Sequence, residues 1–92
     1  MDEIEIRYFS AKWCGPCQNA SFKRGLEDLK AKGWKITKYD ADTDRELASA
    51  SQIMAVPSFL IYRNEQLLDR FSGAMDSQRL EQRFLAAAAK GT

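Results

Sequence analysis

The amino-acid sequence predicts an α/β fold with the element order β-α-β-α-β-β-α, in which a four-stranded mixed sheet is flanked by helices. Three observations predict this class. First, a segment in which charged and apolar residues alternate is followed by a Cys-x-x-Cys motif at the start of a helical pattern. Second, another strand pattern and another helical pattern follow. Third, a strongly apolar segment is joined by a short turn to a second strand, with which it can pair. A helical crossover makes the first two strands parallel, and the last two form an antiparallel hairpin. The 92 residues fit one domain, 1–92.

The first strand and the first helix flank the two cysteines. At Glu3–Phe9 charged and apolar residues alternate, which is typical of a strand with one buried face. From Cys14 to about Lys32 apolar residues recur at helical spacing, and Gly33 serves as the C-cap. The expected core stripe of this helix consists of Phe22, Leu26 and Leu29.

A second strand and a short helix follow. The strand is expected at Trp34–Tyr39, and Asp40–Asp42 forms a loop. Thr43 with Glu46 three residues later is the signature of a capping box, which predicts a helix that ends near Gln52.

A hairpin and a final helix complete the chain. Ser58–Arg63 is strongly apolar, which predicts a strand buried on both faces. Asn64-Glu65 forms a turn, and Gln66–Ser72 returns as the hairpin partner. Asp76 is expected to cap the last helix. The buried side of that helix is expected to hold Leu80, Phe84, Leu85 and Ala88.

The only two cysteines lie in the pentapeptide Trp13-Cys14-Gly15-Pro16-Cys17, at the start of the predicted helix. Two thiols at this spacing lie one turn apart on the same side, close enough to form a disulfide. Unpaired backbone N–H groups of the first turn and the helix dipole favour a thiolate at Cys14, and a thiolate is the nucleophile in thiol chemistry. Gly15 lets the backbone approach closely, and Pro16 suits the first turn. We interpret the motif as a dithiol–disulfide exchange site with Cys14 as the attacking sulfur.

Three other interpretations of the cysteine pair compete with this one. A zinc site needs four ligands, and the chain has no further Cys and no His, so only a dimer could supply them. A structural disulfide that closes so short a loop constrains the unfolded chain little. Inert thiols are disfavoured by the Gly-Pro pair and by the helix-start position. We therefore expect no metal, and the redox interpretation leads.

Charge and hydropathy exclude several classes of partner. The net charge is +1, and no Lys/Arg cluster would follow a nucleic acid. No apolar run has the length of a membrane span. The acidic N-terminus carries no apolar signal stretch, and a cysteine pair without an export signal is typical of a reducing cytoplasm. We therefore expect a cytoplasmic monomer that binds neither nucleic acid nor membrane.

Four segments resemble the thioredoxin family, and the resemblance extends along the whole chain. They are the Trp13–Cys17 motif, Val56-Pro57-Ser58-Phe59, Arg63-Asn64-Glu65 and the segment from Phe71 to Met75. The last three resemble the cis-proline loop, the hairpin turn and the glycine segment before the final helix. The resemblance implies a thioredoxin-like fold, here without the strand and helix with which family members typically begin.

Three positions depart from the family pattern. Tyr8 stands where the family has a buried aspartate, and Phe22 stands where it has a helix-kinking proline. Gln18 stands where a basic residue usually follows the motif. The short chain also resembles glutaredoxins, but these typically carry Cys-Pro-Tyr-Cys. We interpret the protein as a minimal thioredoxin-type member on a glutaredoxin-sized scaffold.

The resemblance implies a protein disulfide reductase that works in two displacements. Cys14 attacks a disulfide in a client protein, and Cys17 then attacks Cys14 and releases the reduced client. The implied partners are disulfide-containing client proteins and thioredoxin reductase or an equivalent. No cofactor is bound, and the reducing equivalents come from that external reductase, an NADPH-linked flavoprotein in the family.

The resemblance also implies a docking surface around the sulfurs. It predicts a cis bond between Val56 and Pro57, which would expose the Val56 backbone for pairing with an extended client segment. An apolar surface would be completed by Trp13, Gly73, Ala74 and Met75.

Three side chains near the motif bear on proton transfer. With no histidine in the chain, backbone N–H groups must stabilise the Cys14 thiolate, with positive potential from Lys12 and Lys38. Lys38 also matches the lysine that pairs with the family's buried aspartate. Tyr8 cannot replace that carboxylate, because a phenol loses its proton only at about pH 10. We hypothesise that the second displacement relies on water or on the Cys14 leaving group, and that Tyr8 is structural.

Two other functions stay open at this point. One is a glutathione-dependent, glutaredoxin-like reductase, which reduction by glutathione would identify. The other is a non-catalytic thioredoxin-fold subunit of a larger complex, which can retain an intact motif.

Overall fold

The predicted order of elements is confirmed, with the first helix divided in two. The computed structural model describes residues 3–90. Its elements are β1 (Ile4–Ser10), α1 (Gly15–Gln18), α2 (Ala20–Ala31), β2 (Lys35–Asp40), α3 (Arg45–Ala50), β3 (Ser58–Arg63), β4 (Gln66–Ser72) and α4 (Ser77–Lys90). The four strands lie in the order β2-β1-β3-β4. β1 and β2 are parallel and the other two pairings are antiparallel, so the predicted mixed sheet is confirmed.

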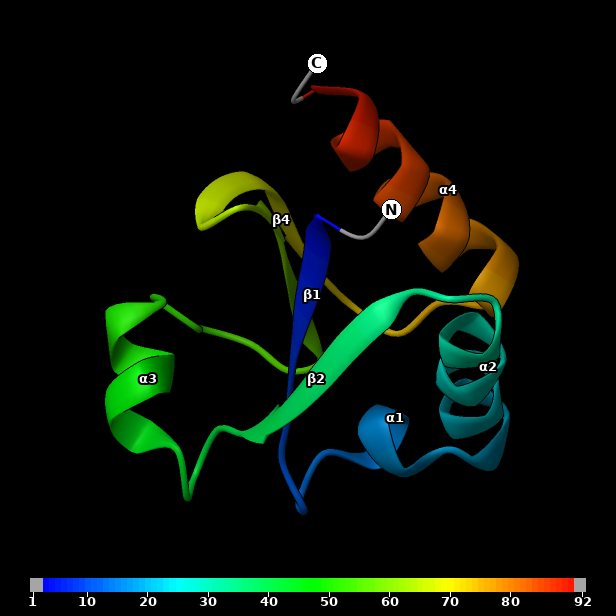
Figure 1. Ribbon diagram of the computed structural model, residues 1–92. Helices are drawn as coiled ribbons and strands as arrows, with labels where there is room; N and C mark the ends of the chain where they lie inside the picture. The colour runs from blue at the N-terminus through cyan, green and yellow to red at the C-terminus, as the bar shows by residue number, and fades with distance from the viewer. Residues whose placement is uncertain (1–2, 91–92) are drawn as a thin grey trace.

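Helices cover both faces of the sheet (Figure 1), with α3 on one side and α1, α2 and α4 on the other. The larger core cluster lies under α2 and α4 and includes Tyr8, Phe59 and Phe84. A smaller cluster under α3 includes Phe9 and Leu60. Neighbouring residues of β3 therefore serve opposite clusters, which confirms that this strand is buried on both faces.

The helix expected from Cys14 to Lys32 is broken at Asn19, and that prediction is wrong on this point. The backbone of Asn19 is extended, with φ −61° and ψ 128°, and its N–H donates to the Pro16 carbonyl. Its side-chain oxygen accepts the N–H of Phe22 at 3.1 Å. Asparagine competes with helical hydrogen bonds in this way and is a preferred N-cap. α1 is therefore a separate single turn, and α2 begins with a cap of its own.

The capping box expected at Thr43 and Glu46 does not form. The N-cap residue of α3 is Asp44, whose side chain makes no capping hydrogen bond and instead accepts the backbone N–H of Asp40. Thr43 donates its own N–H to the Asp40 side chain, as does Asp42. Aspartate side chains close tight turns of this kind, and here the turn takes precedence over the cap.

The final helix is buried as predicted except at Leu85. Leu80 and Phe84 are fully buried, whereas Leu85 is exposed and Ala87 takes the buried position instead. The cap on α4 is confirmed, because the Asp76 side chain accepts the N–H of Arg79 at 2.8 Å.

Gly25 explains how closely α4 packs on α2. A Cβ at Gly25 would lie 3.2 Å from the Cβ of Ser77, tighter than an ordinary carbon–carbon contact. The absence of a side chain therefore permits the close approach of these two helices.

Candidate active site

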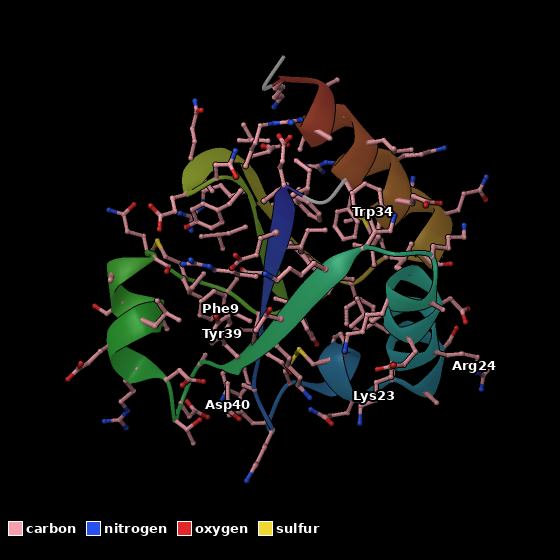
Figure 2. All side chains as sticks on the ribbon, in the orientation of Figure 1. Phe9, Lys23, Arg24, Trp34, Tyr39 and Asp40 are labelled. Atoms are coloured by element: carbon pink, nitrogen blue, oxygen red, sulfur yellow. A yellow bond between two sulfur atoms is a disulfide. The ribbon has the colours of Figure 1, made fainter. Side chains whose placement is uncertain are left out.

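The two cysteines lie at the edge of the sheet where the parallel strands β1 and β2 both end. The segment after β1 carries Cys14, and β2 ends at Asp40, which Figure 2 shows at the end of that strand. The loop before β3 meets them there, because Val56 packs against the cluster formed by Ala11, Cys14 and Cys17. Three loops that are far apart in the sequence therefore surround the sulfurs.

Cys14 and Cys17 form a disulfide with a Cα–Cα distance of 5.3 Å. Cys14 is the N-cap residue of α1, and its Sγ accepts the backbone N–H of Cys17 at 3.2 Å. Pro16 lies in the first turn of α1, and nothing within 4 Å would meet a side chain at Gly15. Both cysteines are buried, with 4% of Cys14 and 1% of Cys17 exposed. A directed N–H donor thus favours negative charge on the Cys14 sulfur.

Local hydrogen bonds hold the motif in place. The N–H of Cys14 donates to the Ala11 carbonyl at 3.2 Å, and the side-chain amide of Gln18 donates to the same oxygen at 3.0 Å. The helix dipole expected to act on Cys14 is reduced, because α1 has only four residues and α2 starts separately. The Cys17 N–H, rather than a long helix, is the stabilising group that faces the sulfur.

The loop before β3 contributes the second wall of the site. The peptide bond between Val56 and Pro57 is cis. The Val56 carbonyl oxygen lies 3.7 Å from the Sγ of Cys14, and the Pro57 carbonyl accepts the N–H of Gly73 at 2.9 Å. This hydrogen bond joins the segment at Gly73 to the loop whose Val56 carbonyl lies beside the Cys14 sulfur.

The segment after Gly73 lines a groove of about 540 Å³ that runs between α2 and the start of α4. Ala74 is exposed, whereas Met75 is partly buried against the main core. Pro16, which lies between the two cysteines in the sequence, also lines this groove.

Trp13 is 70% exposed and is oriented by an aspartate that sequence reasoning missed. Its indole N–H donates to the Asp42 side chain at 2.9 Å. Asp42 belongs to the loop built on Asp40, whose pKa is lowered mainly by the backbone N–H groups of Asp42 and Thr43 that its side chain accepts. The predicted parallel pairing of β1 and β2 could have placed Asp42 near Trp13, because loops that follow neighbouring parallel strands lie at the same edge of the sheet.

Tyr8 lies in the core behind Cys17. Its ring stacks on Phe59 at 5.1 Å and meets Phe22 edge-on at 5.9 Å. Burial raises the pKa of Tyr8 above its ordinary value, and a hydrogen bond with Ser10 opposes this only in part. The phenol is therefore protonated at neutral pH.

The two lysines expected near the site lie in different places. Lys38 lines a cavity of about 170 Å³ together with Cys17 and Tyr8. Lys12 is exposed in the loop before Cys14, where it interacts electrostatically with Asp40. The structure therefore brings Lys38, and not Lys12, to a cavity shared with a cysteine. Figure 2 shows Lys23, which lines the same cavity, on the α1–α2 side of the sheet.

A family model described as thioredoxin matches residues 2–86. The chain belongs to the thioredoxin family. It is 33% identical over 84 residues to the thioredoxin of the catfish Ictalurus punctatus, a match that covers 89% of this chain and 78% of the relative. The X-ray structure of Fasciola hepatica thioredoxin superimposes with a TM-score of 0.80 at 29% identity, over 92% of this chain and 81% of that one. The predicted thioredoxin-like fold is confirmed.

The expectation of a cytoplasmic location is wrong, because other thioredoxins that match this chain are organellar. Thioredoxin Y2 of Arabidopsis thaliana, which is chloroplastic, is 35% identical over 80 residues, a match that covers 82% of this chain. The mitochondrial thioredoxin of mouse is another match. The chain spans about half the length of these two relatives, 46% and 45%. Fold and motif are shared between compartments, so they do not establish a cytoplasmic location.

Membership of the thioredoxin family and the Cys14–Cys17 disulfide together support thiol–disulfide oxidoreductase chemistry. Thioredoxins bind no cofactor of their own, and the family implies disulfide-containing substrates and a reductase partner. Among residues 3–90, no group of three or more metal-ligating side chains is placed to hold a metal ion. Within these residues, no helix combines the length and apolar character that crossing a membrane requires.

Proposed function

We propose that this chain is a single-domain, monomeric thioredoxin that reduces disulfides in client proteins. In the first displacement the Cys14 thiolate attacks one sulfur of the client disulfide, forms a mixed disulfide and releases the other client sulfur as a thiolate. In the second, the Cys17 thiolate attacks the Cys14 sulfur, which releases the second client thiolate and leaves Cys14 and Cys17 oxidised. The client gains two electrons, and the protein loses two.

The hydrogen bond between the Cys17 N–H and the Cys14 Sγ carries the proposal. A sulfur that accepts a backbone N–H is stabilised as a thiolate, so Cys14 is the better nucleophile of the pair. Cys17 is the less exposed of the two, at 1% against 4% for Cys14, which supports Cys14 as the residue that meets the client. Gly15 and Pro16 support this geometry by forming the turn between the sulfurs, and Lys12 adds positive potential from the preceding loop.

Clients would dock on the surface around the disulfide. The backbone of Val56 lies beside the Cys14 sulfur, so an extended client segment that pairs with it would present a disulfide to Cys14. Pro57 and Gly73 are joined by a backbone hydrogen bond and would form the floor of this site. Apolar contact would come from the exposed Trp13 and from Ala74 and Met75.

The proposed source of electrons is an external NADPH-linked flavoprotein reductase that reduces the Cys14–Cys17 disulfide after each turnover. No cofactor would be bound to the chain itself. Reduction of the oxidised protein by NADPH and a thioredoxin reductase, compared with reduction by glutathione, tests this choice.

The function is tested by following reduction of insulin disulfides driven by dithiothreitol. We expect catalysis by the wild type, complete loss in Cys14→Ser, and a mixed disulfide with the client that accumulates in Cys17→Ser. The double variant Cys14→Ser/Cys17→Ser is the matched control for folding and for uncatalysed reduction. Absence of turnover by the folded wild type would contradict the proposal, and client binding that survives both Ser substitutions would favour a non-catalytic binding subunit instead.

A further inference from the structure

A cavity of about 170 Å³ connects Cys17 with the surface between α2 and β2. Leu26 and Ile36 are the apolar residues of its lining, and its volume is enough for several water molecules at about 30 Å³ each. The rest of its lining consists of side chains able to carry or donate a proton: Tyr8, Cys17, Lys23, Glu27, Lys30 and Lys38.

The charge around this cavity is positive. Three lysines and one glutamate line it, and Glu27 is turned outward with 72% of its side chain exposed and an ion pair to Lys30 at 3.4 Å. Within residues 3–90, neither Lys23 nor Lys38 forms a salt bridge. Beyond the cavity, Lys38 interacts at longer range with Asp40.

No buried carboxylate faces Cys17 in the described part of the chain. Tyr8 occupies the position behind this cysteine, and its phenol keeps its proton at neutral pH. A deeply placed carboxylate would take the Cys17 proton as a base, but it would also disfavour the thiolate by like charge. Positive charge has the opposite effect, because it favours the thiolate directly.

We propose that this cavity activates Cys17 for the second displacement, with Lys23 and Lys38 stabilising its thiolate across the cavity and water carrying the proton to solvent. The inference rests on the proposed function and adds two positioning residues to it. Cys17 loses its proton to water, the thiolate then attacks the Cys14 sulfur, and the client thiolate leaves. No oxidant or reductant is needed beyond the mixed disulfide itself.

The direct test is a pH titration of Cys17 in the Cys14→Ser variant, in which Cys17 is the only cysteine. The ultraviolet absorbance of the thiolate reports its fraction. Lys23→Gln and Lys38→Gln should each raise the midpoint by about half a pH unit, since each removes one screened positive charge near the sulfur. Lys23→Arg and Lys38→Arg should restore it. Lys35→Gln, on β2 but outside the cavity, is the matched control and should leave the midpoint unchanged.

The rate of the second displacement gives an independent reading with both cysteines present. Reduced protein mixed with excess coloured aromatic disulfide releases one thiolate when Cys14 attacks and a second when Cys17 resolves the mixed disulfide. Below the Cys17 midpoint, each Lys→Gln variant should resolve about threefold more slowly, which corresponds to half a pH unit in thiolate fraction. The difference should shrink in high salt, because the lysines are exposed.

Glu27→Gln separates this inference from a carboxylate-base mechanism. If positive charge activates Cys17, removal of Glu27 leaves resolution unchanged or faster. A severalfold slower resolution in Glu27→Gln would overturn the inference and identify Glu27 as the proton acceptor. Unchanged Cys17 midpoints in both Lys→Gln variants, with insulin turnover intact, would overturn it as well. Loss of wild-type turnover with the midpoint shifts present would contradict the proposed function alone.

Discussion

The two sulfurs of one disulfide lie in different kinds of surroundings. Cys14 is held by the backbone: a Cys17 N–H faces its sulfur, and the Val56 carbonyl lies 3.7 Å away. Cys17 is surrounded by side chains from β1, α2 and β2 that line a small cavity. Backbone geometry depends little on residue identity, whereas the electrostatics of a side-chain cavity change with every substitution. The attacking half of the site is thus fixed by the fold, and the resolving half is the part that sequence can tune.

The largest expected effect is on the Cys17 side. Tyr8→Ala removes a buried ring that stacks on Phe59, and we expect a loss of about 3–5 kcal/mol in the free energy of unfolding. Denaturant unfolding of the oxidised protein measures it. Tyr39→Ala is the control, because Tyr39 is only half-buried where it stacks on Phe9 and should cost less. Equal losses would contradict the larger contribution to stability expected from the Tyr8 ring.

Asn19→Ala tests the Cys14 side. It removes the hydrogen bond that caps α2, and we expect a loss of about 1 kcal/mol in unfolding free energy. Asn19→Asp keeps an acceptor at the same position and should retain most of the stability. Thermal unfolding of the three proteins makes the comparison, and a stable Asn19→Ala variant would mean that the break in the helix does not depend on this side chain.

The contribution of Asp40 to stability should depend on pH. It bears on the Cys14 side of the site, because Asp40 orders the loop that holds Trp13. Its folded-state pKa is lowered, so its charge adds stability that is complete above the unfolded pKa and is lost as pH falls through the folded pKa. Wild type should therefore have a higher Tm than Asp40→Asn at neutral pH. This gap should narrow on acidification, and a gap independent of pH would contradict the assignment.

The smallest expected effect belongs to the Tyr8 hydroxyl. Tyr8→Phe keeps the stacked ring and removes only the phenol, so the rate at which Cys17 resolves a mixed disulfide should stay the same. Single-turnover release from the coloured aromatic disulfide measures it. A large loss of rate in Tyr8→Phe would show that the hydroxyl takes part in proton transfer.

The sequence predicts those parts of the molecule that depend on periodicity and on contiguous motifs. The element order and the burial of β3 on both faces follow from such patterns, as does the turn at Asn64-Glu65, where both residues have positive φ. The Cys14–Cys17 pair was found in the same way, because spacing within one turn determines which side chains can meet.

Competition between local hydrogen bonds could not be resolved from the sequence. Asn19 interrupts a helical pattern that continues on both sides of it, and Asp40 accepts the Thr43 N–H that the Glu46 side chain would accept in a capping box. In both cases the side chain of a short polar residue takes precedence over a regular pattern. The miss at Leu85 is of another kind, because it concerns which face of α4 packs on the core: Ala87 rather than Leu85 is buried.

Contacts between distant segments were not predicted, although the parallel pairing of β1 and β2 was a usable signal for one of them. The pairing of Trp13 with Asp42 depends on β1 and β2 ending at the same edge, and the placement of Lys23 and Lys38 around one cavity depends on how α2 packs beside β2. Sequence spacing does not reveal either pair, because helical and strand periodicity relate only residues within one element.

The local hydrogen bonds around α1 have a consequence for protein engineering. Ala11 accepts from Cys14 and Gln18, Cys14 accepts from Cys17, and Asn19 donates to Pro16, so all of these contacts begin and end within residues 11–19. Much of the shape of this segment is therefore set by its own backbone, although Trp13 and Asn19 also bond to Asp42 and Phe22 outside it. Exchanges on the neighbouring surfaces of α2 and β2 would then adjust reactivity independently of sulfur geometry, which makes this small scaffold a suitable starting point for graded libraries of redox catalysts.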